Sequence, residues 1–115
     1  MNVFLIVIHR DLTGKNPRPS ADEIKEAIKP YQDWIQGLAR EDKLVAPPKR
    51  WDLEGKVIAH NKKVKKGPYA DGVTSIGGVL LIKAENYDEA VALARLCPII
   101  KYGAIVEVRM AMPTA

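Results

Sequence analysis

The sequence predicts an α+β fold in which two helices cover one face of an antiparallel sheet. Apolar runs at residues 2–8 and 76–84 have the composition of buried strands. Each run is followed by a segment with a helix N-cap and helical spacing of apolar residues, and an alternating strand at 105–110 comes last. This order of strands and helices is typical of the split βαβ arrangement of a ferredoxin-like fold.

The two helices have recognisable start sites. Ser20 with Glu23 three residues later forms a capping box, and apolar residues then recur at helical spacing as far as Leu38. Pro30 lies within this stretch, so we expect it to kink the helix or break it into two pieces. Asn86 is the expected cap of the second helix.

The segment between the first helix and the second long strand is irregular. Residues 51–53 and 56–58 flank Glu54-Gly55 in the manner of a tight hairpin. Four lysines follow within residues 62–66. A short lysine run is typical of a solvated strand edge or loop, although lysines beside a pocket would also steer an anionic molecule into it.

Length and composition favour a single cytoplasmic domain, residues 1–115. A chain of 115 residues fits one domain, and no apolar run approaches the roughly 20 residues that cross a membrane. The lone Cys97 excludes an internal disulfide framework and agrees with a reducing compartment. The histidines and Cys97 lack metal-ligand spacing, and no dinucleotide fingerprint is present, so we expect neither a metal nor a cofactor.

The first strand is apolar on both faces, which predicts a partner. The residues of one face are Phe4, Ile6 and Ile8, and those of the other are Val3, Leu5 and Val7. The two helices cover only one face, and the chain has no third layer for the other. We therefore expect a homodimer that packs sheet to sheet about a two-fold axis.

His9, Asp71 and Tyr69 are the first candidate site residues. His9 ends the first strand, where it could act as a general base oriented by Asp11, although a histidine satisfied by solvent or backbone is the competing interpretation. Tyr69 and Asp71 lie in a turn that Pro68 stiffens, where they could face a ligand or could serve the turn alone. We take His9 and Asp71 as candidate catalytic residues and Tyr69 as a candidate ligand contact.

Trp34, Gln32 and Arg10 complete the candidate binding residues. Trp34 lies off the main apolar stripe of its helix and could line a cleft or pack at a dimer edge. Gln32 could supply an amide or face solvent, and Arg10 directly follows His9. Together these residues predict a pocket for a small, anionic metabolite.

Five short motifs follow one another in the second half of the chain, at residues 66–70, 77–82, 87–90, 96–98 and 103–109. In these motifs the chain resembles the YCII-related family, in particular its DGPF-type branch. The resemblance implies ferredoxin-like protomers that pair into a dimeric α+β barrel. It names no reaction, because the biochemistry of these proteins is mostly unassigned.

Three departures from the family pattern weaken a catalytic interpretation. Lys66 stands where the family's name motif begins with an aspartate. Better-studied relatives are thought to pair a helix histidine with an aspartate, and the corresponding positions here are Gln32 and Cys97. Neither residue reproduces an imidazole oriented by a carboxylate.

Three functions follow, and the sequence leaves open whether the protein is an enzyme. The first is a homodimer that binds a small molecule, with proton-transfer activity such as isomerisation or lysis. The alternative is a non-catalytic regulatory or structural dimer. Nucleic-acid binding is disfavoured, because Pro68 does not suit a central strand and residues 76–84 offer no aromatic ring for base stacking.

Overall fold

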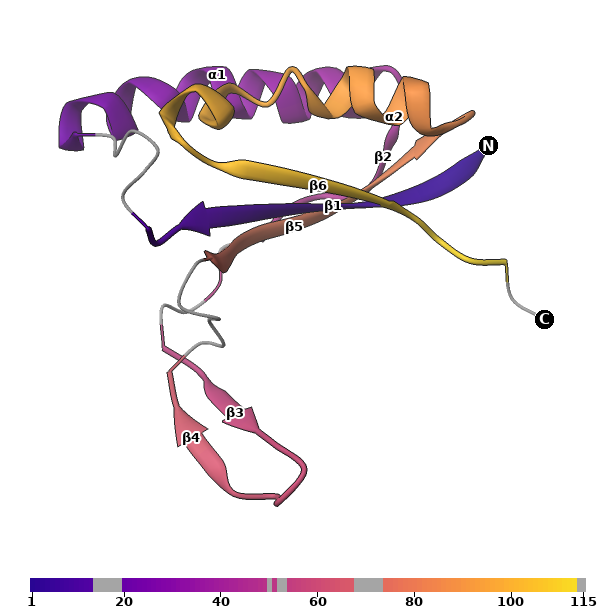
Figure 1. The fold of residues 1–115 in the computed structure, drawn as a ribbon. Coiled ribbons are helices and arrows are strands. Elements are labelled where there is room, and N and C mark those ends of the chain that lie inside the picture. Colours follow the sequence, from indigo (N-terminus) through magenta and orange to yellow (C-terminus); the bar gives the residue numbers. More distant parts are fainter. Residues whose placement is uncertain (14–19, 50, 52–53, 68–73, 114–115) are drawn as a thin grey trace.

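The chain forms a four-stranded sheet with two helices on one face and a separate hairpin (Figure 1). The structure, a computed structural model, describes residues 1–13, 20–49, 51, 54–67 and 74–113. Its elements in chain order are β1 (Asn2–Asp11), α1 (Ala21–Arg40), β2 (Leu44–Ala46), β3 (Lys56–Ile58), β4 (Val64–Lys66), β5 (Thr74–Ala84), α2 (Tyr87–Ala94), the 3-10 helix η1 (Pro98–Tyr102) and β6 (Ile105–Met110).

The main sheet has the strand order β2-β5-β1-β6, and each neighbouring pair is antiparallel. The predicted α+β class is confirmed, and the topology is consistent with a ferredoxin-like fold. Pairing with both β5 and β6 makes β1 a central strand of the sheet, with a neighbour on each edge. The β3–β4 hairpin is an insertion between β2 and β5.

The first helix begins as predicted but is not broken at its proline. The Ser20 side chain accepts a hydrogen bond from the Glu23 backbone N–H (3.2 Å), and the Glu23 carboxylate accepts one from the Ser20 backbone N–H (3.0 Å). The helix then runs without interruption across Pro30 to Arg40, so the predicted break into two pieces is wrong. Pro30 is exposed, and the carbonyl that loses its helical donor can therefore be hydrated.

The core lies between the helices and one face of the sheet. Its largest fully buried side chains are Phe4, Ile6, Leu80 and Ile82, all from β1 and β5. The helices contribute small or branched residues to the buried core, including Ala27, Leu38, Ala90 and Ala94. Packing of these side chains fixes both helices over the central strands.

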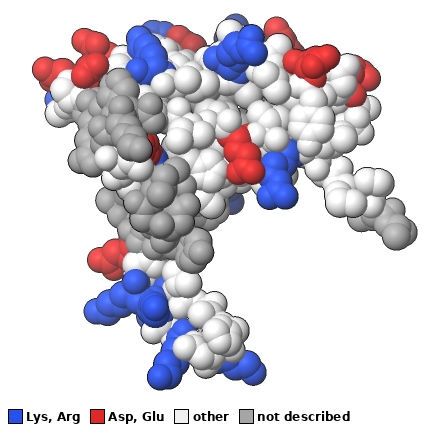
Figure 2. Space-filling model, in the orientation of Figure 1, with Lys and Arg blue, Asp and Glu red and all other residues white. Residues whose placement is uncertain are grey.

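A hairpin forms from β3 and β4. The two strands pair in the register Lys56 opposite Lys66 and Ile58 opposite Val64. The predicted pairing of 56–58 with 51–53 falls partly on residues 52–53, which lie outside the described residues. The Gly55 carbonyl accepts a hydrogen bond from the Gly67 N–H (2.7 Å), which places Gly55 at the open end of the hairpin. We call residues 54–67 the arm; it extends from the sheet on the side away from the helices (Figure 1). Figure 2 shows lysine side chains along it.

Candidate functional site

A pocket with a volume of about 880 Å³ lies where α1, η1 and the sheet meet. It is lined by Ile8, Arg10, Asp11, Leu12, Ile24, Ala27, Ile28, Tyr31, Gln32, Pro48, Lys49, Gly77, Gly78, Ile99, Tyr102, Gly103 and Ala104. Most of this wall is apolar. Ile24 and Ile28 of α1, two of the apolar residues at helical spacing, are 53% and 51% exposed and border this space.

A few polar side chains are set into this apolar wall. Arg10 and Lys49 supply positive charges from two separate segments, and both residues are exposed. Gln32 contributes an amide from α1, while Tyr31 and Tyr102 add phenol groups. An apolar cavity with a few polar groups is the usual composition of a small-molecule site.

A bulge in the sheet shapes the pocket next to Arg10. Ile8 of β1 pairs with Gly78, but the next residue, His9, pairs with Ile76, so Gly77 is the extra residue on β5. A Cβ atom on Gly77 would lie 3.0 Å from the Arg10 Cγ atom. Glycine at this position therefore lets the Arg10 side chain lie against the strand at the pocket wall.

Two titratable groups near the pocket are held neutral. Burial raises the pKa of the Tyr31 hydroxyl, and the nearby Cys97 raises it further. Burial also raises the pKa of the Cys97 thiol, against a hydrogen bond from the Ile99 backbone that lowers it. Cys97 is buried within the hydrophobic cluster, so it behaves as a small apolar residue and not as a nucleophile.

His9 lies on the opposite face of the sheet from the pocket. Its neighbours Ile8 and Arg10 line the pocket, and alternate residues of a strand point to opposite faces. The His9 Nε2 atom is 2.9 Å from a carboxylate oxygen of Glu107 on β6, with side chains 21% and 42% exposed. The Asp11 carboxylate accepts hydrogen bonds from Thr13, so the carboxylate that contacts His9 is that of Glu107.

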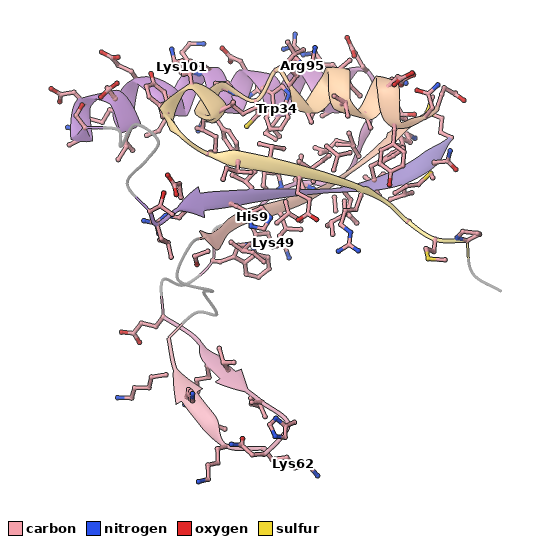
Figure 3. The ribbon with its side chains drawn as sticks, in the orientation of Figure 1. His9, Trp34, Lys49, Lys62, Arg95 and Lys101 are labelled. Atoms are coloured by element: carbon pink, nitrogen blue, oxygen red, sulfur yellow. The ribbon has the colours of Figure 1, made fainter. Side chains whose placement is uncertain are left out.

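Trp34 has a packing contact. Its indole Nε1–H donates a hydrogen bond to the Leu93 carbonyl of α2 (3.0 Å), and its ring packs against that of Tyr31. Figure 3 shows Trp34 in the helix layer and His9 at the sheet. Trp34 joins the two helices and is not among the residues that line the pocket.

The structure thus brings together only part of the predicted site. Arg10 and Gln32 share the pocket, whereas His9 and Trp34 lie elsewhere. Tyr69 and Asp71 fall outside the described residues.

Sequence reasoning missed Lys49, Tyr102 and Glu107 as members of these clusters. Glu107 had a usable indication, because a ferredoxin-like sheet places the first and last strands side by side and makes Glu107 a neighbour of the first strand. No local sequence pattern indicated Lys49 or Tyr102, since these residues reach the pocket from a loop and from the 3-10 helix.

In the described part of the chain, no cluster of histidine, cysteine and acidic residues could hold a metal ion. No described helix has the length and apolar character needed to cross a membrane.

Comparison with known families identifies the chain. A family model of the YCII-related domain matches residues 4–112, so the chain belongs to this family. The match spans both helices and all strands of the main sheet except the first two residues of β1. A search of curated proteins gave no match.

Proposed function

We propose that this YCII-related protein is a homodimer that binds a small anionic metabolite in the pocket beneath α1. The observation that carries the proposal is the pocket itself, whose volume of about 880 Å³ lies within the range of small-molecule sites. Its apolar wall suits the hydrocarbon part of a ligand. Arg10 and Lys49 suit a carboxylate or phosphate, and Gln32 adds a hydrogen-bonding group.

The dimer is proposed to form through the open face of the sheet, the face away from the helices. Val3, Leu5 and Leu81 remain only partly buried there, and Ile105 on β6 is exposed. An apolar sheet face of this kind is stabilised when a second copy covers it about a two-fold axis. The family resemblance implies the same dimeric α+β barrel. The motif at residues 66–70 favours the DGPF-type branch, and the single cysteine favours a cytoplasmic location.

Proton-transfer chemistry is a weaker part of the proposal. His9 is the candidate general base and Asp71 the candidate partner in acid–base work, but His9 faces away from the pocket. A second function, a non-catalytic regulatory dimer, has a specific observation in its favour. Among the described residues that line the pocket there is no histidine, glutamate or cysteine, and the Asp11 carboxylate there accepts hydrogen bonds from Thr13. The lining therefore supports binding of a ligand better than turnover.

Thermal-shift measurements with a panel of small carboxylates and phosphates test the binding proposal. A ligand at 100 times its Kd stabilises the protein by about 2.7 kcal/mol. Arg10→Gln and Lys49→Gln are expected to weaken the response at least tenfold in Kd. Lys25→Gln, an exposed lysine of α1 outside the pocket, is the matched control. Equal losses in the pocket variants and the control would contradict a ligand held by Arg10 and Lys49.

Light scattering during size-exclusion chromatography tests the dimer separately. We expect a two-chain mass at micromolar concentration and a one-chain mass for Leu5→Lys, because the new charge would be buried in the interface. A stable wild-type monomer at that concentration would remove the dimer from the proposal and leave the pocket untouched.

A further inference from the structure

The arm carries all of the chain's net charge. Residues 54–67 contain five lysines and one glutamate, Glu54, which gives a net charge of +4. The whole chain also has a net charge of +4, so the rest of it holds thirteen basic and thirteen acidic residues. The rest of the chain is therefore neutral, and the net positive charge belongs to the arm, which extends away from the sheet (Figures 1 and 2).

The arm lysines are not neutralised within the described part of the chain. The ion pairs formed there by lysine and arginine involve Lys29, Lys43, Lys83 and Arg109, all of them outside the arm. Each arm lysine is exposed. Lys56 also stands directly opposite Lys66, a like-charge cross-strand pair that destabilises a hairpin. A bound anion would remove this repulsion.

The arm also exposes an apolar pair between its lysines. Ile58 and Val64 face each other across the strands and are 68% and 58% exposed. The strands β3 and β4 form a two-stranded sheet of their own, and such a hairpin is only marginally stable in water. The arm has repelling charges, exposed apolar side chains and only two paired strands. These features indicate that a binding partner stabilises it.

We propose that the arm binds the phosphodiester backbone of duplex nucleic acid without sequence preference. The major groove of B-DNA is about 12 Å wide and admits a two-stranded β-ribbon. Strand alternation places Lys56 and Lys66 on one face of the ribbon and Lys65 on the other, with Lys62 and Lys63 at the turn end. Positive charge on both faces suits a groove with a phosphate wall on each side, and suits a single acidic protein surface less well.

Phosphate binding by the arm does not depend on the aromatic residues that the main sheet lacks. The absence of aromatic residues from 76–84 argues against base stacking on the main sheet, whereas phosphate contacts need only positive charge. The arm contributes no residue to the pocket lining, so the proposal stands or falls independently of the metabolite pocket.

Fluorescence anisotropy with a labelled mixed-sequence DNA duplex of about 20 base pairs tests the proposal, with KCl varied from about 20 to 200 mM. Four lysine–phosphate contacts predict a log–log slope of Kobs against salt of about −3.6. Scrambling the duplex sequence should leave the affinity unchanged. A double-stranded RNA of the same length shows whether the backbone alone or the B-form groove is bound. No binding at the lowest salt concentration would overturn the proposal.

Two quadruple variants distinguish an effect of the arm from an effect of the net charge. The arm variant replaces Lys62, Lys63, Lys65 and Lys66 with glutamine. The body variant replaces four exposed residues outside the arm with glutamine and so loses the same charge; they are Lys25, Arg40, Arg95 and Lys101. Figure 3 shows Arg95 and Lys101 in the helix layer and Lys62 at the far end of the arm.

The arm variant should lose at least tenfold in affinity and most of the salt slope, while the body variant retains both. Circular dichroism and chemical unfolding of both variants establish that the body remains folded. Equal losses in the two variants would reduce the effect to net charge and overturn the assignment to the arm. Wild-type binding to phosphatidylserine vesicles or polyglutamate at least as tight as to the duplex would overturn nucleic acid as the partner.

Discussion

The two faces of the main sheet have similar sequences and different surroundings. On the helix-covered face, Phe4 and Ile6 are fully buried, whereas on the open face Leu5 is only partly buried and Val7 is 6% exposed. Both sets of side chains come from one uninterrupted apolar run. The difference shows that apolar alternation on its own predicts that both faces need a cover, but not whether the cover comes from the same chain.

The two faces also separate two kinds of chemistry. The covered face holds the pocket with Arg10 and Gln32, and the open face holds the hydrogen bond between His9 and Glu107. These groups are adjacent in sequence but point away from each other. If the protein has catalytic activity, a ligand in the pocket is therefore served by residues other than His9.

The largest effect that distinguishes the two faces should come from substituting neighbouring residues of β1. Ile6→Ala removes a fully buried side chain and is expected to lower the free energy of unfolding by about 2–5 kcal/mol. Leu5→Ala should cost less than about 1.5 kcal/mol at protein concentrations where the protein is monomeric, because the side chain is already partly hydrated. Urea unfolding at several protein concentrations measures both values. Equal losses at the lowest concentration would show that the open face is covered within the chain.

A smaller loss is expected at the hydrogen bond that joins the two helices on the covered face. Trp34→Phe keeps an aromatic ring between the helices but removes the donor to the Leu93 carbonyl. The expected loss in the free energy of unfolding is about 1 kcal/mol, as for a typical hydrogen bond with a partly buried partner. Trp51→Phe, an exposed tryptophan, is the control and should change stability little. If the two variants behave alike, the Trp34–Leu93 bond contributes nothing measurable.

The parts of the fold that the sequence predicted depend on local patterns. The capping residues Ser20 and Asn86 act within one helical turn, and both caps were found where expected. The pairing of β3 with β4 was not predicted, because Glu54-Gly55 has the composition of a turn, whereas residues 59–63 join these strands and Lys62 there has a φ of 61°. The short strand β2 was missed because its formation depends on pairing with β5, and not on its own three residues.

The candidate site was less predictable than the fold, because its contacts join distant segments. His9 meets Glu107 across 98 residues of sequence, and the order of strands decides this contact. The sequence suggested Asp11, a near neighbour, which instead accepts hydrogen bonds from Thr13. Gln32 and Trp34 are two residues apart, yet only Gln32 reaches the pocket, because their side chains leave the helix in different directions.

Two glycine substitutions should have small and different effects, one on stability and the other on ligand binding in the pocket. Gly37→Ala lies in α1 with no atom within 4 Å of the new Cβ, so it should stabilise the protein by about 0.5–1 kcal/mol. Gly77→Ala places a Cβ 3.0 Å from Arg10 Cγ and forces that side chain to move. We expect Gly77→Ala to weaken ligand binding and Gly37→Ala to leave it unchanged, as measured by thermal shift. A ligand response that survives Gly77→Ala would remove Arg10 from the proposed site.

The smallest expected effect is the pH dependence of the ion pair that joins the start of β2 to α2. Lys43 Nζ lies 2.8 Å from Glu89 Oε1, and this hydrogen bond is the main cause that lowers the pKa of Glu89 below 4.5 and raises the pKa of Lys43 above 10.5. The Glu89 contribution to stability is therefore complete above about pH 4.5 and is lost as the pH falls through its folded-state value. The Lys43 contribution is complete below about pH 10.5 and is lost as the pH rises through its folded-state value.

Glu89→Gln should flatten the acid limb of a plot of unfolding free energy against pH and reduce its dependence on salt. Asp33→Asn, which removes the exposed pair with Lys29, is the control and should leave that limb nearly unchanged. The Lys43–Glu89 pair links α2 to the start of β2. The arm lysines have no such acidic partner among the described residues. An acid limb unaffected by Glu89→Gln would mean that the Lys43–Glu89 pair contributes nothing measurable to stability.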